Sequence, residues 1–511
     1  MTSVPVLSIV TWAPFVGALL IMFTARRRPL AVRLIAATAT GISAALSVYV
    51  FLAFDPEAGF QFYEKLPLVP SLGVSYELGV DGLNVLLVLL TSIIIVAGVF
   101  ASWTVTVRSQ EFYALLLALV TGVYGVFVSL DLLVFFLFYE LAVLPMYLLI
   151  GIWGTSAEIR PQGIFGWALR RTGVGTKEYA AMKLTLYLLF GSAFILVGIL
   201  ALYVAAGSST FSFLEMEGIQ FDRGLQSWVF LAFYVGFGIL AGIWPLHTWS
   251  PDGHASAPTA VSMLHAGVLM KLGAYGVVRL GLGLLPDGTQ EWVWLVGAIA
   301  CVNIVYGALS AMAQTDLKYV IAYSSVSHMG VVMLGMATLT ETGLNGSVFQ
   351  MFAHGIMTGL FFALVGLVYE KAHSRAIFSM GGFGQMMPGI ATAFTVAGLS
   401  SLGLPATAGF VAEFMTFLGA WQSTHPWWLF PAVIGAFLTA VYVLRVTKQI
   451  FWGPKAADPH FQHLPDAQGP EWVALVLLVG TLVLFGVAPG IAIGPVDTAT
   501  LPLLLRLGGA P

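Results

Sequence analysis

Long apolar stretches, separated by short polar ones, run through almost the whole chain. Many reach the roughly 20 residues that an α-helix needs to cross a bilayer. About fourteen such stretches are present, at residues 4–24, 31–54, 82–103, 111–129, 131–153, 179–205, 227–248, 256–282, 292–312, 317–338, 345–370, 388–421, 427–451 and 471–490. Helices are expected because single strands would leave backbone groups unpaired in lipid. The pattern predicts an all-α polytopic membrane protein with about 14 transmembrane helices.

Composition narrows the classes of function. The chain is 59% hydrophobic and 9% charged, whereas a soluble domain carries about 25% charged residues. The net charge is −3, and no basic stripe suggests nucleic acid. One cysteine, Cys301, lies in an apolar stretch. A single thiol excludes a disulfide framework, a thiolate zinc site and a cysteine-ligated iron–sulfur cluster.

Basic residues predict the orientation, because Lys and Arg gather on the inner side of a membrane. If the first span runs inward, twelve fall in inside loops and three in outside loops. The inside set is Arg26, Arg27, Arg28, Arg33, Arg108, Arg160, Arg170, Arg171, Lys177, Lys371, Arg375 and Lys455, and the outside set is Lys65, Arg223 and Arg506. We therefore expect a multi-pass protein of the bacterial inner membrane with both termini in the periplasm.

Two spans contain glycine and proline near their middles, at residues 238–247 and 399–409. Proline removes a helical hydrogen bond, and glycine adds backbone freedom beside it. The two breaks fall five spans apart, which predicts two inverted five-helix repeats, a transporter signature. We expect an N-terminal segment at 1–110, a first repeat at 111–282, a second at 291–452, and a last helix with a periplasmic tail at 471–511. A kink that only helps packing is the alternative for either break alone.

Five ionisable residues lie inside predicted spans: Glu140, Lys183, Lys271, Lys318 and Glu413. Burying such a group at mid-bilayer costs at least about 2.5–3.5 kcal/mol, so these residues usually mark ion paths. A static ion pair is the alternative for any one of them. Lysine and glutamate change their protonation when burial and neighbouring charge change. The expected chemistry is proton transfer.

Histidines extend this set of candidates. His247 lies beside the first break, His265 precedes Lys271, and His328 and His354 lie in apolar spans. A lone membrane histidine is more often a packing residue than a relay. Neighbouring hydroxyl groups, such as those of residues 323–328, favour water and proton movement. No phosphate loop, metal-ligand cluster or nucleophile elbow accompanies them.

Four motifs resemble a known family. The first begins Trp-Pro-Leu-His-Thr-Trp-Ser-Pro-Asp-Gly-His at Trp244 and runs to Lys271. The second covers residues 314–330, and the others are Gly-Val-Asp-Gly-Leu at 79–83 and the stretch 403–413. Together they resemble the antiporter-like, proton-translocating subunits of respiratory complex I (NADH–quinone oxidoreductase), of the chain M or chain 4 type. The resemblance covers nearly the whole chain.

This resemblance implies two half-channels, one in each repeat. Glu140 would modulate a central lysine, Lys271 and Lys318 would pass protons along the midplane, and Glu413 would end the path. The chain itself would bind no cofactor or metal. NADH, FMN, iron–sulfur clusters and quinone would be bound by other subunits. The partners would be the other membrane subunits of the complex, including neighbouring antiporter-like subunits, and the lipid bilayer.

One position departs from the family pattern. The family commonly has a lysine about four residues before the seventh-span Trp-Pro, as the partner of the fifth-span glutamate. Here the residue is Leu240. We expect Lys183 to pair with Glu140 instead, and a separation well beyond about 8 Å, several times contact distance, would exclude this pair. His265 is a second candidate for the substitute.

Three other functions remain open. The chain resembles subunits of Mrp-type cation/proton antiporters and of membrane-bound hydrogenase or formate-oxidising complexes, which share the same fold. A structural anchor for a redox arm belongs to another class. An anchor predicts that Lys271→Met and Glu413→Gln leave pumping intact, whereas a pump predicts normal assembly with pumping lost.

Overall fold

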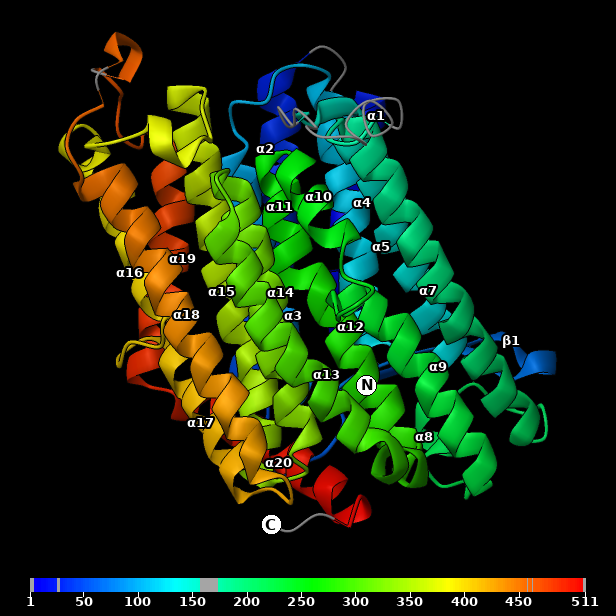
Figure 1. Cartoon of the computed structure of the whole chain (residues 1–511). Helices are drawn as coiled ribbons and strands as arrows, with labels where there is room; N and C mark the ends of the chain where they lie inside the picture. The colour runs from blue at the N-terminus through cyan, green and yellow to red at the C-terminus, as the bar shows by residue number, and fades with distance from the viewer. Residues whose placement is uncertain (1–3, 25–27, 157–172, 457, 462, 509–511) are drawn as a thin grey trace.

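Helices that run side by side build the protein, as the computed structural model shows (Figure 1). The structure describes residues 4–24, 28–156, 173–456, 458–461 and 463–508. The long helices of the N-terminal half are α1 (Val6–Thr24), α2 (Pro29–Leu52), α3 (Val85–Ala101), α4 (Ser109–Val128), α5 (Leu132–Trp153), α7 (Lys177–Ala205) and α9 (Arg223–Ala241). Those of the C-terminal half are α13 (Pro286–Ala313), α14 (Leu317–Ala337), α15 (Glu341–Ala372), α16 (Pro388–Ser401), α17 (Ala408–Gln422), α18 (Leu429–Thr447) and α19 (Pro470–Val487).

The predicted spans agree with these helices. In the described part of the chain, twelve helical segments are long and apolar enough to cross a membrane. The shorter apolar helix α3 and the broken helix α16–α17 occupy the two remaining predicted ranges. The prediction of an all-α polytopic membrane protein is therefore confirmed.

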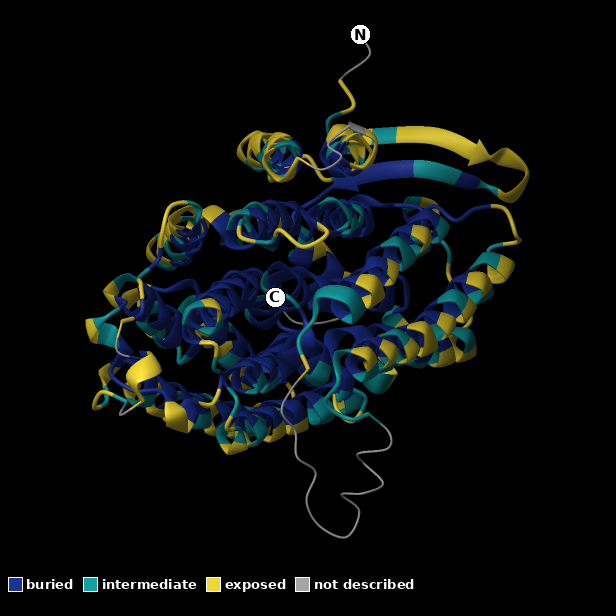
Figure 2. Cartoon of the chain, turned by 90° about the horizontal axis from the view of Figure 1, so that it is seen from above, coloured by how far each residue is buried: buried dark blue, intermediate teal, exposed yellow. Residues whose placement is uncertain are grey.

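Burial separates the centre of the bundle from its rim (Figure 2). The apolar windows of α15 and of residues 259–282 are 100% buried, whereas those of α1 and α2 are 39% and 33% buried. A helix that is apolar all round and fully buried belongs to the core of a bundle. The candidate residues Lys271 and His354 therefore lie on the most enclosed helices.

A β-hairpin is a feature of the fold that the apolar pattern did not predict. Strands β1 (Gln61–Val69) and β2 (Val74–Val80) pair antiparallel. β2 turns toward the helices, and β1 is mostly exposed (Figure 2). The short helix α8 (Phe213–Met216) and the C-terminal helix α20 (Gly490–Arg506) lie at the same end of the bundle (Figure 1). We call this the hairpin end.

Both predicted helix breaks are present. α9 stops at Ala241, because Gly242 adopts φ 75°, a left-handed conformation that glycine tolerates. The chain resumes in α10 (Trp249–Ser256) and α11 (Thr259–Leu264). It continues through the π-helical turn η2 (His265–Leu269), α12 (Met270–Gly276) and a second π-helical turn, η3 (Val277–Leu282).

The second break separates α16 from α17, with Gly403 at φ 74° and Ala406 at φ 73°. The two breaks place half-helix ends inside the bundle, where backbone groups become available to side chains. The inverted relation of the two five-helix units stays a prediction, as do the domain boundaries.

The opposite end of the bundle carries the basic loops. Residues 373–387, the beginning of α7 and the end of α5 lie there (Figure 1). We call this the vestibule end. Five of the twelve basic residues that we assigned to the inside, Arg26, Arg27, Arg160, Arg170 and Arg171, lie outside the described residues.

Candidate functional site

Four titratable side chains form a chain through the centre of the bundle. The Nζ of Lys271 lies 2.8 Å from Nδ1 of His354. The ring of His354 lies 5.2 Å, centroid to centroid, from that of His328. His328 in turn places Nδ1 3.1 Å from Oε1 of Glu413. All four are buried, and Lys271 is 0% exposed.

The helix breaks bring these groups together. Ser401 ends α16, and Glu413 lies in the second turn of α17, so the two face His328 from either side of the break. The Oγ of Ser401 lies 3.1 Å from Nε2 of His328. Lys271 follows the π-helical turn η2 and also donates to the carbonyl of Ala266. π-Helical turns interrupt the regular pairing of backbone groups and occur often at functional sites.

A stack of two histidines lies on the other side of Lys271. The rings of His254 and His265 are 3.8 Å apart. Trp249 covers His265 at 5.0 Å, and Phe362 covers His254 at 4.9 Å. Both imidazoles are fully buried, and none of their four ring nitrogens has a hydrogen-bond partner among the described residues. Buried polar atoms are normally paired, with protein or with water, and an imidazole can bind a proton at either ring nitrogen.

A polar cavity of about 670 Å³ lies at the vestibule end. We call it the vestibule. Its lining includes Asp252 on α10, Asp316 and Tyr319 at the start of α14, and Arg375 in the loop after α15. Lys183 reaches Asp252 at 2.7 Å. The vestibule thus gathers charged groups from helices that are far apart in the sequence.

Two cations beside the vestibule hold the half-helix α10. Lys318 donates to the carbonyl of Ala257 at 2.7 Å, and Arg375 donates to that of Ala255 at 2.6 Å. Cations stabilise the C-terminal end of a helix, where unpaired carbonyls concentrate negative charge. Lys318 therefore binds the end of α10 instead of joining the chain from Lys271 to Glu413.

The expected pair between Lys183 and Glu140 is wrong, because Lys183 pairs with Asp252. Helix geometry gives the reason. Glu140 lies thirteen residues from the vestibule end of α5 and Lys183 six from that of α7, which places them about 20 Å and 9 Å deep. Glu140 instead lies beside Ser192 of α7, and its Oε1 has no hydrogen-bond partner among the described residues.

His247 lies apart from the central chain. Its ring meets the edge of Tyr306 at 5.0 Å and of Tyr323 at 6.4 Å. The side chain is 2% exposed, and neither ring nitrogen has a hydrogen-bond partner among the described residues. The structure thus joins Lys271, His354, His328 and Glu413, while His247, Lys183, Lys318 and Glu140 occupy other places.

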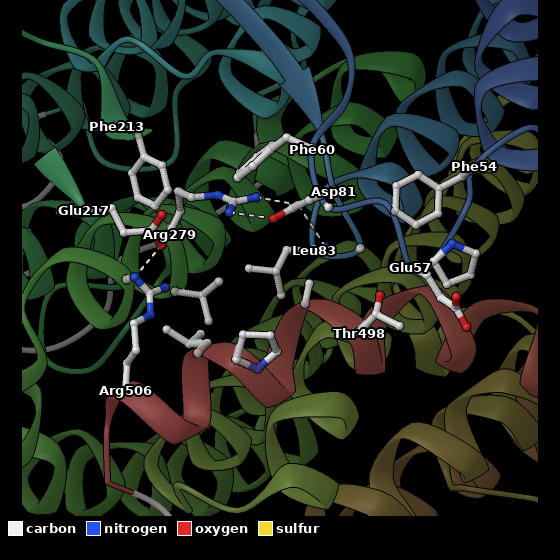
Figure 3. Close-up of a pocket in the computed structure, with 18 residues that line it drawn as sticks. Phe54, Glu57, Phe60, Asp81, Leu83, Phe213, Glu217, Arg279, Thr498 and Arg506 are labelled. Atoms are coloured by element: carbon white, nitrogen blue, oxygen red, sulfur yellow. Dashed lines mark hydrogen bonds and ion pairs between the residues drawn. The ribbon is translucent and has the colours of Figure 1, made fainter. Parts of the chain in front are cut away.

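A second charged cavity, of about 320 Å³, lies at the hairpin end (Figure 3). Asp81 accepts two hydrogen bonds from the guanidinium of Arg279, at 2.6 and 2.7 Å. Phe60, Phe213 and Tyr275 lie around that guanidinium at 5.3–5.4 Å. The pair anchors the start of α3 to η3, eight residues beyond Lys271.

Outside the spans, the hairpin is held by Lys65 of β1. Its Nζ lies 3.4 Å from Glu77 of β2 and 3.4 Å from Glu215 of α8. Burial acts to lower the pKa of Lys65, but the two carboxylates outweigh it and raise that pKa above its usual value. The charged lysine therefore fixes the hairpin to the end of the bundle.

Several polar residues at these sites were not among the predicted candidates, and Asp252, His254 and Ser401 are examples. Asp252 and His254 lie in the Pro-Asp-Gly-His motif, between two predicted spans. Polar residues are expected between membrane spans, so the apolar pattern did not mark these two. The family motif was the only sequence feature that pointed to them. Ser401 precedes the second break, which was the signal available for it.

The fold and the buried chain of titratable groups define a polytopic membrane subunit of the ion-translocating class. The chain belongs to the NADH:quinone oxidoreductase/Mrp antiporter family, whose transmembrane model matches residues 167–439. That segment includes both helix breaks and the whole central chain of titratable groups.

Relatives match over almost the full length. NAD(P)H-quinone oxidoreductase chain 4 2 of Thermosynechococcus vestitus is 36% identical, over 99% of this chain and 93% of its own length. NADH-quinone oxidoreductase subunit M of Rhodobacter capsulatus is 35% identical, over 96% and 95%. A chain of respiratory complex I from Thermus thermophilus has a similar structure, with a TM-score of 0.85, 29% identity and coverage of 98% and 99%.

The fold is shared more widely. A chain of the Mrp complex from Dietzia superposes with a TM-score of 0.81 at 20% identity, covering 99% of each chain. At that identity the likeness concerns the fold alone. The structure thus shows the membrane helices and both breaks, and the family model and the full-length relatives show the family.

Proposed function

We propose that this chain is a proton-translocating membrane subunit of an NADH:quinone oxidoreductase. Protons would pass from Lys271 through His354 and His328 to Glu413. The observation that carries the proposal is the continuous placement of these four buried groups, with contacts of 2.8 Å and 3.1 Å at its two ends. The full-length relatives named as subunits of such enzymes support it.

The geometry suits transfer in single steps. Lys271 donates toward Nδ1 of His354 and can hand over its proton there. A histidine ring accepts at one nitrogen and releases from the other, and Nε2 of His354 has no partner among the described residues. His328 presents one nitrogen to Ser401 and the other to Glu413. The two histidines thus connect Lys271 at one end of the path to Glu413 at the other.

Electron transfer would occur elsewhere in the complex. No group of three or more potential metal-binding side chains (His, Cys, Asp or Glu) occurs in the described ranges, and we assign NADH, FMN, iron–sulfur clusters and quinone to other subunits. The partners would be neighbouring membrane subunits, including antiporter-like ones. We place the complex in the bacterial inner membrane with the vestibule facing the cytoplasm, because the predicted inside loops are rich in Lys and Arg.

The test uses the native complex in membrane vesicles. Lys271→Met and Glu413→Gln should leave assembly intact but lower both proton pumping and quinone reduction by tenfold or more. Lys455→Met and Glu178→Gln are matched controls, because both side chains are exposed and far from the central chain. The measurements are pumping by a pH-sensitive dye, NADH oxidation, and subunit content of the purified complex.

Normal pumping in both Lys271→Met and Glu413→Gln would overturn the proposal and favour a structural anchor. Purification of the native complex distinguishes the proposed function from that of an Mrp-type exchanger. Flavin and iron–sulfur subunits should purify with the chain. If it purifies only with small membrane antiporter subunits, the chain is part of an Mrp-type exchanger.

A further inference from the structure

We propose that Asp252 is the group that takes up protons from the vestibule, and that Lys183 controls this uptake. The proposal rests on the proposed function, because it supplies the entry to the path that begins at Lys271. It assigns a transfer role to Asp252 and gives Lys183 a partner different from the expected one.

Asp252 is open to the vestibule. Its side chain is 24% exposed and lines the cavity. Lys183 donates to Oδ2 at 2.7 Å, and the hydroxyl of Tyr319 donates to Oδ1 at 3.0 Å. A carboxylate can accept about four hydrogen bonds. Each oxygen thus keeps a lone pair that is available to a proton from the cavity.

The second acid of the vestibule is held differently. Oδ1 of Asp316 accepts from the backbone N–H of Lys318 at 2.8 Å, as the N-cap of α14. Its Oδ2 lies 3.2 Å from Nε of Arg375. The guanidinium of Arg375 stays protonated in proteins, and both carboxylate oxygens of Asp316 are engaged by these two contacts. Asp316 therefore serves structure, and Asp252 is the acid that can change charge.

Lysine differs from arginine in this respect, since it can give up its proton when its environment changes. The Lys183–Asp252 pair can exist as ammonium and carboxylate, or as amine and carboxylic acid after the proton moves across the 2.7 Å contact. The net charge of the pair is zero in either form. A proton entering from the cavity converts the carboxylate to the acid while Lys183 keeps its own proton.

Histidines continue the route inward. Asp252 lies two residues before His254 on α10, and His254 stacks on His265, six residues before Lys271. His254 lies within electrostatic range of Lys271. Two stacked imidazolium cations would repel each other strongly, so the pair carries at most one extra proton. The proposed order of groups is Asp252, then the histidine pair, then Lys271; no hydrogen bond joins Asp252 to His254 in the described part of the chain.

Chemical rescue tests the assignment of Asp252. In the detergent-solubilised native complex, Asp252→Ala should lower NADH:quinone turnover by tenfold or more with normal assembly. Formate at tens of millimolar should raise the turnover of Asp252→Ala several-fold, because a small carboxylate fits the vestibule and replaces the missing group. Chloride at the same ionic strength should restore nothing. Asp316→Ala is the matched acid, and formate should not rescue it.

Lys183 is tested by two replacements. Lys183→Met removes the charge, and Lys183→Arg keeps it. Both should slow turnover at least fivefold, since neither methionine nor an arginine, which keeps its proton, can exchange a proton with Asp252. A merely structural ion pair predicts near-normal turnover in Lys183→Arg, and that result would overturn the role of Lys183.

Two outcomes separate this inference from the proposed function. If Lys271→Met is inactive while Asp252→Ala turns over normally, only the inference is wrong. An assembled Asp252→Ala complex that is slow but insensitive to formate also overturns it. If Lys271→Met pumps normally, the proposed function fails, whatever the vestibule variants do.

Discussion

At the scale of single residues, burial decides what a charge contributes. Arg279 and Arg506 both pair with a carboxylate at the hairpin end (Figure 3). The Arg279–Asp81 side chains are 6% and 11% exposed, whereas those of Arg506 and Glu217 are 41% and 30% exposed. Water screens the second pair and hardly reaches the first.

We therefore expect unequal effects from two matched substitutions. Asp81→Asn leaves a buried guanidinium without its counter-charge, which typically costs about 3–5 kcal/mol. Glu217→Gln should cost less than about 1 kcal/mol, as exposed pairs do. The stability of each variant is measured by heating the purified complex and recording the temperature at which this chain is lost from it. Equal stability of the two variants would contradict the prediction.

The identity of a buried charge is readable from the sequence, but its partner is not. Lys271, His328, His354 and Glu413 were predicted as candidates, because each interrupts an apolar span. The partner of Lys183 depends on depth within the bundle, and a few residues along a helix shift a side chain by several ångströms. Asp252 lies in a stretch between two predicted spans, so it belonged to a family motif but was not predicted as a proton-path residue.

At the scale of elements, α20 packs against the turn between β2 and α3 at a glycine, Gly82. A Cβ at Gly82 would lie 1.8 Å from the carbonyl oxygen of Pro495 in α20, which is far inside contact distance. A Cβ at Gly494, one residue earlier in α20, would meet nothing within 4 Å. The close approach thus exists because residue 82 has no side chain.

Gly82→Ala should displace α20 from the turn between β2 and α3, because a backbone oxygen cannot rotate away as a flexible side chain can. We expect the C-terminal segment to become several-fold more sensitive to protease in the assembled complex. Gly494→Ala is the matched control and should leave cleavage unchanged. If both variants resist cleavage equally, the packing of α20 does not depend on this contact.

The elements themselves were largely predictable, since an apolar run of about 20 residues has few alternatives in lipid. Glycine and proline also marked both breaks correctly. The hairpin was missed because its strands lie outside the spans and depend on pairing between β1 and β2, which no local pattern announces. α10 was missed because eight residues between a break and Pro258 are too short for an apolar signal.

At the scale of the whole molecule, a polar cavity lies at each end of the bundle, and the central chain of titratable groups lies between them. The vestibule reaches Asp252 at one end, and the hairpin-end cavity reaches the Asp81–Arg279 pair at the other. Between them, Lys271 lies near the middle of residues 259–282, a fully buried span. Direction of transport then depends on which end faces the cytoplasm.

The Lys and Arg distribution predicts that the vestibule end faces the cytoplasm, and single cysteines can test it. Ser379→Cys lies in the loop after α15 and Ser71→Cys at the tip of the hairpin, and both serines are exposed. The native Cys301 is buried and serves as the internal control. A membrane-impermeant maleimide should label residue 379 only in inside-out vesicles and residue 71 only in right-side-out vesicles. Opposite labelling would invert the proposed direction of proton entry, because the vestibule would then open to the periplasm.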